Sequence, residues 1–112
     1  MLYDLEERTA KFGENIIILC NSLIKNTINN QLISQIVRSA TSIGANYMEA
    51  NQASSKKDFR NKICISQKEA NETKHWLRML AIANKDKITE CRLYWKEAHE
   101  LTLIFSKISK SC

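Results

Sequence analysis

Five basic residues in the middle of the chain share one face of a predicted helix. At about 100° per residue, their side chains fall within about 40° of one another; they are Lys56, Arg60, Lys74, Arg78 and Lys85. Such a row could contact successive phosphates of a nucleic acid and would position it without reading its sequence. Lys57 and Lys87 could add to these contacts. A solvated helix flank, whose Lys and Arg stems cover the core edge, gives the same pattern. The net charge of +5 is compatible with both interpretations.

A second row, of polar residues, occurs at the spacing of core positions. Its members follow one another by three or four residues: Gln35, Arg38, Ser42, Asn46 and Glu49. Ser and Asn are poor helix formers in solvent, so their place here favours close packing or hydrogen bonding. Glu69 lies near apolar neighbours in projection, and a buried carboxylate needs a cation, for which Arg38 is the obvious candidate. We predict a structural polar network of Arg38, Ser42, Asn46, Glu49 and Glu69; a solvated face and a ligand or catalytic site are the alternatives.

Patterns typical of catalytic and metal sites do not occur in the sequence. There is no Gly-rich phosphate loop, no Gly-x-Ser-x-Gly and no His-Glu-x-x-His. Glu72 and His75 match the Glu-x-x-His of di-iron bundles once, but Lys96 stands where a second copy, with His99, would need Glu. The four cysteines are far apart and form no Cys-x-x-Cys pair. We therefore predict no metal, no cofactor and no enzymatic activity.

Four amphipathic segments must position these residues, and we place helices over residues 4–25, 31–53, 56–84 and 89–109. The chain has 112 residues, two Gly and no Pro, which favours one domain of long helices over sandwiches or barrels. Short connections between such helices predict an all-α fold, an antiparallel up-down-up-down four-helix bundle.

Local signals set the expected ends of these helices. Asp4, Ser55 and Thr89 are predicted N-caps, and Ser55 with Asp58 resembles a capping box. The Asn- and Thr-rich stretch 25–30 is predicted to be a loop. From Phe59 to Leu80 the third helix carries a coiled-coil-like seam. It also has a second apolar side, where another subunit could dock, formed by Ile65, Trp76 and Ala83.

The longest apolar runs fall far short of the ~20 residues of a membrane span. No basic leader with an apolar stretch and cleavage site opens the chain, and the cysteines suit a reducing compartment. We expect a cytoplasmic protein without membrane contact.

Three stretches of the chain carry a resemblance to a known family: residues 38–50 (RSATSIGANYMEA), 54–59 (SSKKDF) and 68–78 (KEANETKHWLR). They are similar to bacterial 23S rRNA intervening-sequence proteins. The signature positions of that family hold Arg38, Ser42, Asn46, Glu49, Phe59, Glu69, Trp76 and Leu77. Gly44 and Asn51 stand where the commoner signature has Pro and Gly, as in a subfamily variant.

The resemblance implies an up-down four-helix bundle that assembles as a homopentamer. It also implies kinship with the basic pentameric accessory proteins of diversity-generating retroelements, which bind a reverse transcriptase and nucleic acid. It defines no catalytic residues. The leading hypothesis is a non-enzymatic oligomer that binds RNA or other nucleic acid through the basic row. The alternative is an adaptor that docks a larger partner enzyme and binds no nucleic acid itself.

Overall fold

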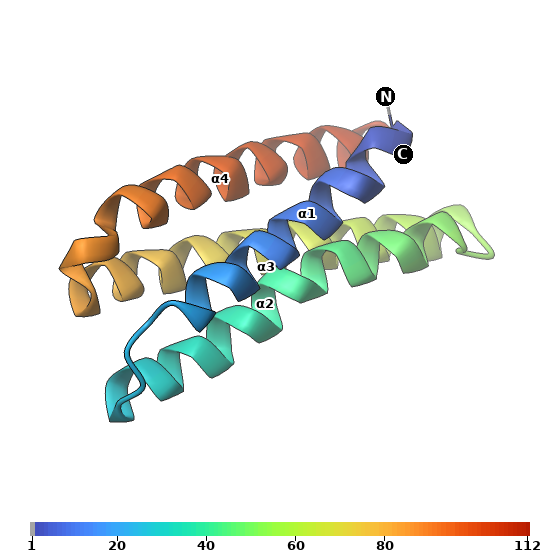
Figure 1. Ribbon diagram of the computed structural model, residues 1–112. Coiled ribbons are helices and arrows are strands. Elements are labelled where there is room, and N and C mark those ends of the chain that lie inside the picture. The colour runs from blue at the N-terminus through green and yellow to red at the C-terminus, as the bar shows by residue number, and fades with distance from the viewer. Residues whose placement is uncertain (1) are drawn as a thin grey trace.

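The computed structural model describes residues 2–112, with the side chains of residues 5–112, and in this range the chain forms four α-helices. These are α1 (Leu2–Asn21), α2 (Thr27–Asn51), α3 (Lys56–Ala83) and α4 (Ile88–Lys110), and a short 3-10 helix, η1 (Lys85–Lys87), precedes α4. Successive helices run in opposite directions, as Figure 1 shows. The prediction of an all-α, antiparallel up-down-up-down bundle is confirmed.

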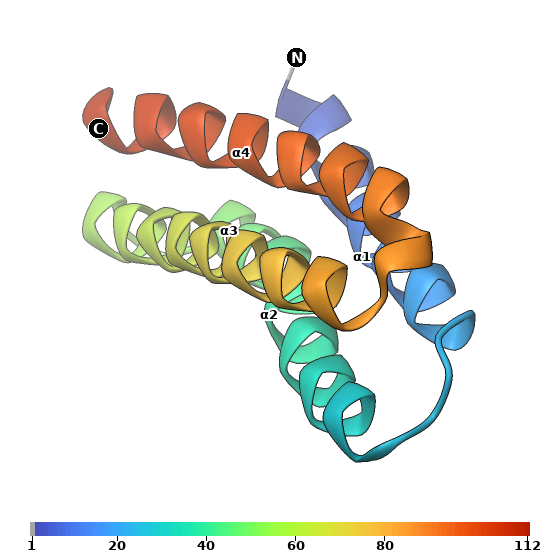
Figure 2. The ribbon, with the colours of Figure 1, turned by 90° about the vertical axis from the view of Figure 1, so that its left-hand side faces the viewer.

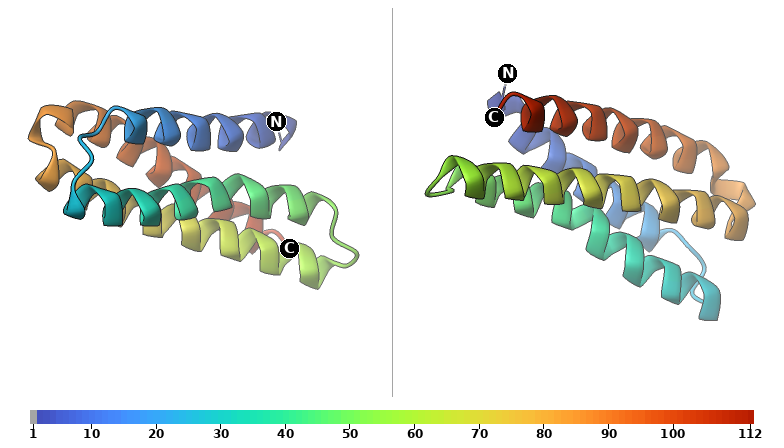
Figure 3. Two further views of the ribbon diagram at one scale, coloured as in Figure 1. Left: turned by 60° about the horizontal axis from the view of Figure 1, so that its bottom comes forward. Right: turned by 180° about the vertical axis from the view of Figure 1, so that it is seen from behind.

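The four helices do not contact one another equally. α3 lies between α2 and α4 and packs along both, while α1 packs along α2 (Figure 2 and Figure 3). Contact between α1 and α4 is slight. The bundle is therefore closed along three of its edges and open along the fourth, between α1 and α4.

Apolar side chains from all four helices form one core. The largest of them include Phe12 of α1, Ile43 and Tyr47 of α2, Leu77 of α3 and Phe105 of α4. The centroids of the Tyr47 and Phe105 rings lie 5.9 Å apart, and the ring planes are tilted against each other. This contact joins α2 to α4 across the interior. The predicted seam of α3 is buried from Ile63 to Leu80, while Phe59 at its start is partly exposed.

Small hydroxyl residues allow α2 and α3 to approach closely. Thr73 Oγ1 donates to Ser39 Oγ at 2.9 Å, and Ser66 Oγ donates to the carbonyl oxygen of Ile43 at 3.0 Å. Ser39, Ser66 and Thr73 are fully buried. Their polar atoms are thus satisfied inside the contact, which removes the usual penalty for burying them.

The prediction of a loop over residues 25–30 is wrong from Thr27 onward. α2 begins at Thr27, and the side chain of Asn26 accepts a hydrogen bond from the backbone N–H of Asn29 as the N-cap. The buried amides of Asn29 and Asn84 exchange two hydrogen bonds of 2.8 and 2.9 Å, which join the start of α2 to the end of α3. An asparagine with such a distant partner no longer competes with its own helix backbone.

The other helix ends differ from the predictions by smaller amounts. α1 ends at Asn21, not Lys25, and the Lys25 ammonium donates to the carbonyls of Cys20 and Leu23 just beyond. Ser55 caps α3 as predicted. α4 begins one residue before Thr89, and no side chain caps it. Asp4 is within α1, which begins at Leu2, and its side chain lies outside the described residues.

α2 ends at Asn51 rather than at residue 53, α3 at Ala83 rather than 84, and α4 at Lys110 rather than 109. Differences of this size are ordinary for helix ends, which fray and whose last turns tighten.

We expect Asn84→Ala to lower the free energy of unfolding by about 1–3 kcal/mol, because the buried Asn29 amide loses both hydrogen bonds to Asn84 and keeps only the one to the Ile24 carbonyl. Urea denaturation at neutral pH measures the change. Asn30→Ala, an exposed neighbour, is the matched control and should change stability by less than about 0.5 kcal/mol. Equal small effects of both substitutions would contradict the structural role of the amide pair.

Candidate nucleic-acid interface

The predicted basic row follows the edge where α3 meets α4. Lys56, Arg60, Arg78 and Lys85 are exposed, and Lys74 is half-buried. Lys56 shares a shallow hollow with Ser111 and Cys112 at the end of α4, and Arg78 lines a pocket together with residues of α4. Lys85 lies in η1, beyond the end of α3, so the helical projection that includes it is wrong for that residue.

None of the five cations is neutralised by a carboxylate among the described side chains. Within residues 5–112, the salt bridges of Lys and Arg side chains involve Arg8, Arg38, Lys62 and Lys87, and no member of the row. This edge of the molecule therefore presents its positive charge to solvent, where an anionic ligand can reach it.

Two aromatic residues of α4 lie against the middle of the row. The rings of Trp95 and His99 stack with centroids 5.3 Å apart and 14° between their planes. Lys74 Nζ lies 5.1 Å from the centroid of the Trp95 ring and 3.1 Å from His99 Nδ1. Because an ammonium group only donates, His99 Nδ1 is the acceptor.

This cluster combines a cation with an aromatic stack, as single-stranded nucleic-acid sites do. Its members carry no role in the predicted basic row, apart from Lys74. The spacing of Trp95 and His99, four residues apart on one helix face, was the available signal.

The predicted polar network divides into separate groups. Arg38 Nη1 lies 3.2 Å from both carboxylate oxygens of Glu69, and its Nη2 also pairs with Glu72. Trp76 Nε1 donates to Glu72 at 3.1 Å. That hydrogen bond, followed by the pairing with Arg38, holds the pKa of Glu72 below its ordinary value. The Arg38 side chain is 48% exposed, so this ion-pair group of Arg38, Glu69 and Glu72 lies at the surface of the molecule and not in the core.

The side chains of the three other predicted members, Ser42, Asn46 and Glu49, bond elsewhere than to the guanidinium group of Arg38 or the carboxylate of Glu69. Ser42 Oγ donates to the carbonyl of Arg38 at 2.6 Å, and Asn46 Nδ2 donates to the carbonyl of Ser42 at 2.9 Å, one turn back in each case. Glu49 pairs with Lys62 of α3 at 2.7 Å. Short polar side chains on a helix reach their own backbone more readily than a neighbouring helix.

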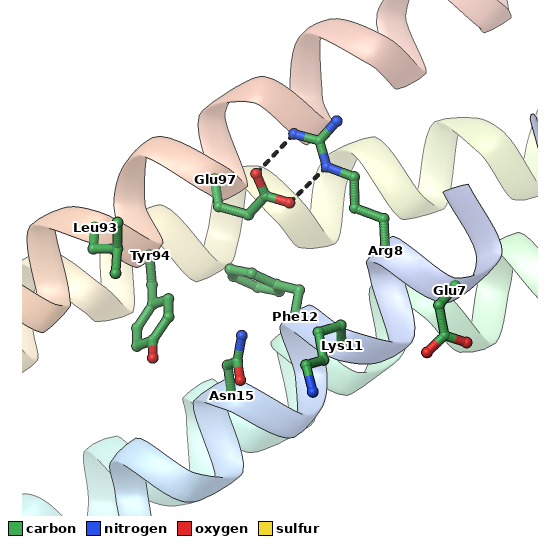
Figure 4. Close-up of a pocket in the computed structure, with 8 residues that line it drawn as sticks. All are labelled: Glu7, Arg8, Lys11, Phe12, Asn15, Leu93, Tyr94 and Glu97. Carbon is green, nitrogen blue, oxygen red and sulfur yellow. Dashed lines mark hydrogen bonds and ion pairs between the residues drawn. The ribbon is translucent and has the colours of Figure 1, made fainter. Parts of the chain in front are cut away.

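The open edge between α1 and α4 forms a groove of about 660 Å³. Figure 4 shows Phe12 of α1 and Tyr94 of α4 lining it, next to an ion pair between the two helices. Arg8 Nε and Nη2 each donate to Glu97 at 2.7 Å, and Nη2 also reaches Glu100 at 3.1 Å. This pairing raises the pKa of Arg8 above its ordinary value. Sequence reasoning missed the pair, because nothing local connects its partners.

Among the described residues, the buried thiols of Cys20 and Cys91 are close enough to interact. Across residues 5–112, no group of three or more His, Cys, Asp or Glu side chains is placed to hold a metal ion. Burial raises the pKa of the Cys20 and Cys91 thiols to about 11, and Cys64 and Cys112 are exposed. The Glu-x-x-His pair is divided: Glu72 pairs with Arg38, while His75 meets the edge of the Trp76 ring.

No helix in the described residues has the length and apolar character needed to cross a membrane. Comparison with known proteins then decides the family. The family model of the 23S rRNA-intervening sequence protein matches residues 3–107.

The chain belongs to this family. It is also similar to the crystal structure of a protein of unknown function from the S23 ribosomal protein family of Bacteroides thetaiotaomicron. That similarity has 35% sequence identity and a TM-score of 0.82, and it covers 94% of this chain and 97% of the other. Among curated proteins, none matches the chain. The matched residues thus include all of α3 and η1, which carry the basic row.

We expect Arg38→Ala to lower the free energy of unfolding by about 1 kcal/mol at neutral pH, a modest effect because the pair is half-exposed. The folded-state pKa of Glu72 is lowered, so its contribution is present above the ordinary carboxyl pKa and is lost as the pH falls through the folded-state value. The difference between the two proteins should therefore shrink on acidification, measured by urea denaturation as a function of pH. A loss that does not vary with pH would contradict the assigned pairing, and Arg60→Ala is the unpaired control.

Proposed function

We propose that this 23S rRNA-intervening sequence protein is a non-enzymatic, oligomeric RNA-binding protein that holds the phosphate backbone along the α3–α4 edge. The observation that carries the proposal is the row Lys56, Arg60, Lys74, Arg78 and Lys85, which has no carboxylate partner within residues 5–112. Of the cations that do have partners, Arg8 and Arg38 lie on other helices, Lys62 pairs with Glu49 of α2, and Lys87 pairs with Glu90 close to Lys85.

The length of the row suits a nucleic-acid strand. α3 has 28 residues, which corresponds to about 42 Å at a rise of about 1.5 Å per residue. A single strand can follow such a path over several nucleotides, with each cation displacing condensed counterions from a phosphate. The expected binding is therefore steeply dependent on salt and weakly dependent on sequence.

Oligomerisation is supported by apolar side chains that the single chain leaves in solvent. Ile17 and Ile18 of α1 and Leu93 and Leu103 of α4 are 41%, 66%, 60% and 58% exposed. Burial of these side chains against another subunit would remove their apolar surface from water. We propose the homopentamer that the family resemblance implies, in which every subunit would repeat the basic row.

Light scattering of the purified chain should give the mass of a pentamer, and a monomer would contradict the assembly.

The open α1–α4 groove favours a second candidate function. A cavity of about 660 Å³ lined by Phe12, Leu93 and Tyr94 could receive a segment of a larger partner protein, as an adaptor would need. In that case the isolated protein would bind no nucleic acid at any salt concentration.

We expect a generic single-stranded RNA of about 12 nucleotides to bind with a log–log salt slope near −3.5, or about −0.7 for each of five phosphates neutralised. Fluorescence anisotropy between about 50 and 200 mM salt measures it. Arg60→Gln should make the slope shallower by about 0.7 and weaken binding about fivefold. Lys62→Gln, on the same helix but paired with Glu49, is the matched control and should change the slope less. Affinity that does not vary with salt would overturn the phosphate-contact mechanism.

A further inference from the structure

A small pocket opens between the end of α3 and the start of α4, next to the basic row. Its volume is about 240 Å³. Five apolar side chains and three larger planar ones line it: Leu77, Ala81, Ile82, Ile88 and Cys91, with Arg78, Arg92 and Trp95. Burial raises the pKa of Cys91 to about 11, so its thiol stays neutral and adds to the apolar wall.

The charge of this pocket is entirely positive. No carboxylate of residues 5–112 lines it, and Arg78 and Arg92 are exposed. Neither arginine takes part in a salt bridge with a described side chain. An apolar cavity with two free guanidinium groups complements a ligand that has a flat apolar part and an anionic part.

The Trp95 ring is held in place before any ligand arrives. His99 stacks on it and Lys74 lies over it, while 38% of the residue remains exposed. A preorganised aromatic surface loses little conformational entropy when a second flat group stacks on it. Within a duplex, each base is covered on both sides by its neighbours, so only an unpaired base can lie against a tryptophan ring.

We infer that this pocket receives one unpaired base of single-stranded RNA, which stacks on Trp95 while Arg78 and Arg92 hold its flanking phosphates. The inference rests on the proposed RNA-binding function and narrows it to single strands. At this pocket, stacking on Trp95 would add to the phosphate contacts that the basic row makes along the rest of the strand. The guanidinium groups and the ring have separable roles, because only the guanidinium groups contribute to the salt dependence.

The first experiment is tryptophan fluorescence. The chain has two tryptophans, so Trp76→Phe leaves Trp95 as the single reporter. Addition of a single-stranded oligoadenylate of about eight nucleotides should quench its emission, while the same strand in a duplex should not. Because Trp95 is intact in this protein, the measurement does not depend on whether a substitution at Trp95 folds.

The second experiment separates stacking from charge. Trp95→Leu should weaken single-strand binding about five- to thirtyfold without changing the salt slope, and leave duplex binding unchanged. Arg92→Gln should weaken binding and also make the slope shallower by about 0.7. If no RNA binds at low salt, the proposed function itself fails. If RNA binds with a steep salt slope while Trp95 is neither quenched nor needed, only the pocket inference is overturned, and the cavity then fits a contact with protein.

Discussion

The close contact between α2 and α3 sets the position of almost every other functional group. Ser39, Ser66 and Thr73 bury their hydroxyls between these helices and satisfy them there. Larger side chains would push the helices apart, and unsatisfied ones would cost free energy on burial. With this register fixed, one flank of α3 meets α2, where Arg38 reaches Glu69 and Glu72. The opposite flank meets α4 and carries the basic row. The structural pair and the candidate interface are therefore two consequences of one helix orientation.

The position of α1 follows from a different close contact. A Cβ atom at Gly44 would lie 3.2 Å from Thr9 Oγ1, which is tighter than an ordinary contact, so a small residue there lets α1 lie directly on α2. α1 then packs along α2 and meets α4 only slightly, where Arg8 and Glu97 form the main polar link across the groove. Of the apolar residues that line this opening, Phe12 is buried while Leu93 is 60% exposed, and Leu93 is the side chain that the proposed oligomer would cover.

The sequence pattern predicted the core well, because burial in a bundle is governed by a periodic spacing that a single helix already displays. It failed where a side chain depends on a distant partner. Asn29 has the composition of a loop residue, but in the structure its side-chain amide is hydrogen-bonded to Asn84, 55 positions away. Ser42 and Asn46 shared a face with Arg38, yet periodicity does not tell whether a polar side chain turns to a neighbouring helix or to its own backbone. Trp95 and His99 were visible as a pair, but their role depends on Lys74 from α3, and the Arg8–Glu97 pair depends on the path of α1.

The net charge of the chain understates how unevenly that charge is distributed. Six carboxylates, of Glu49, Glu69, Glu72, Glu90, Glu97 and Glu100, take part in salt bridges with cations outside the basic row. A second, separate hollow lies between α1 and α2, and Glu6, Glu7 and Glu14 line it. It lies diagonally across the bundle from α3, which α1 does not pack along in the described residues. These three carboxylates thus lie on the α1–α2 side of the molecule, while the unpaired cations of the basic row lie along the α3–α4 edge. In the proposed function, an anionic strand would be drawn toward α3 and away from these carboxylates, so long-range attraction would orient it before any base or phosphate is in contact. Orientation of this kind needs only the segregation of charge, and the pocket next to Trp95 lies on the side that the field favours.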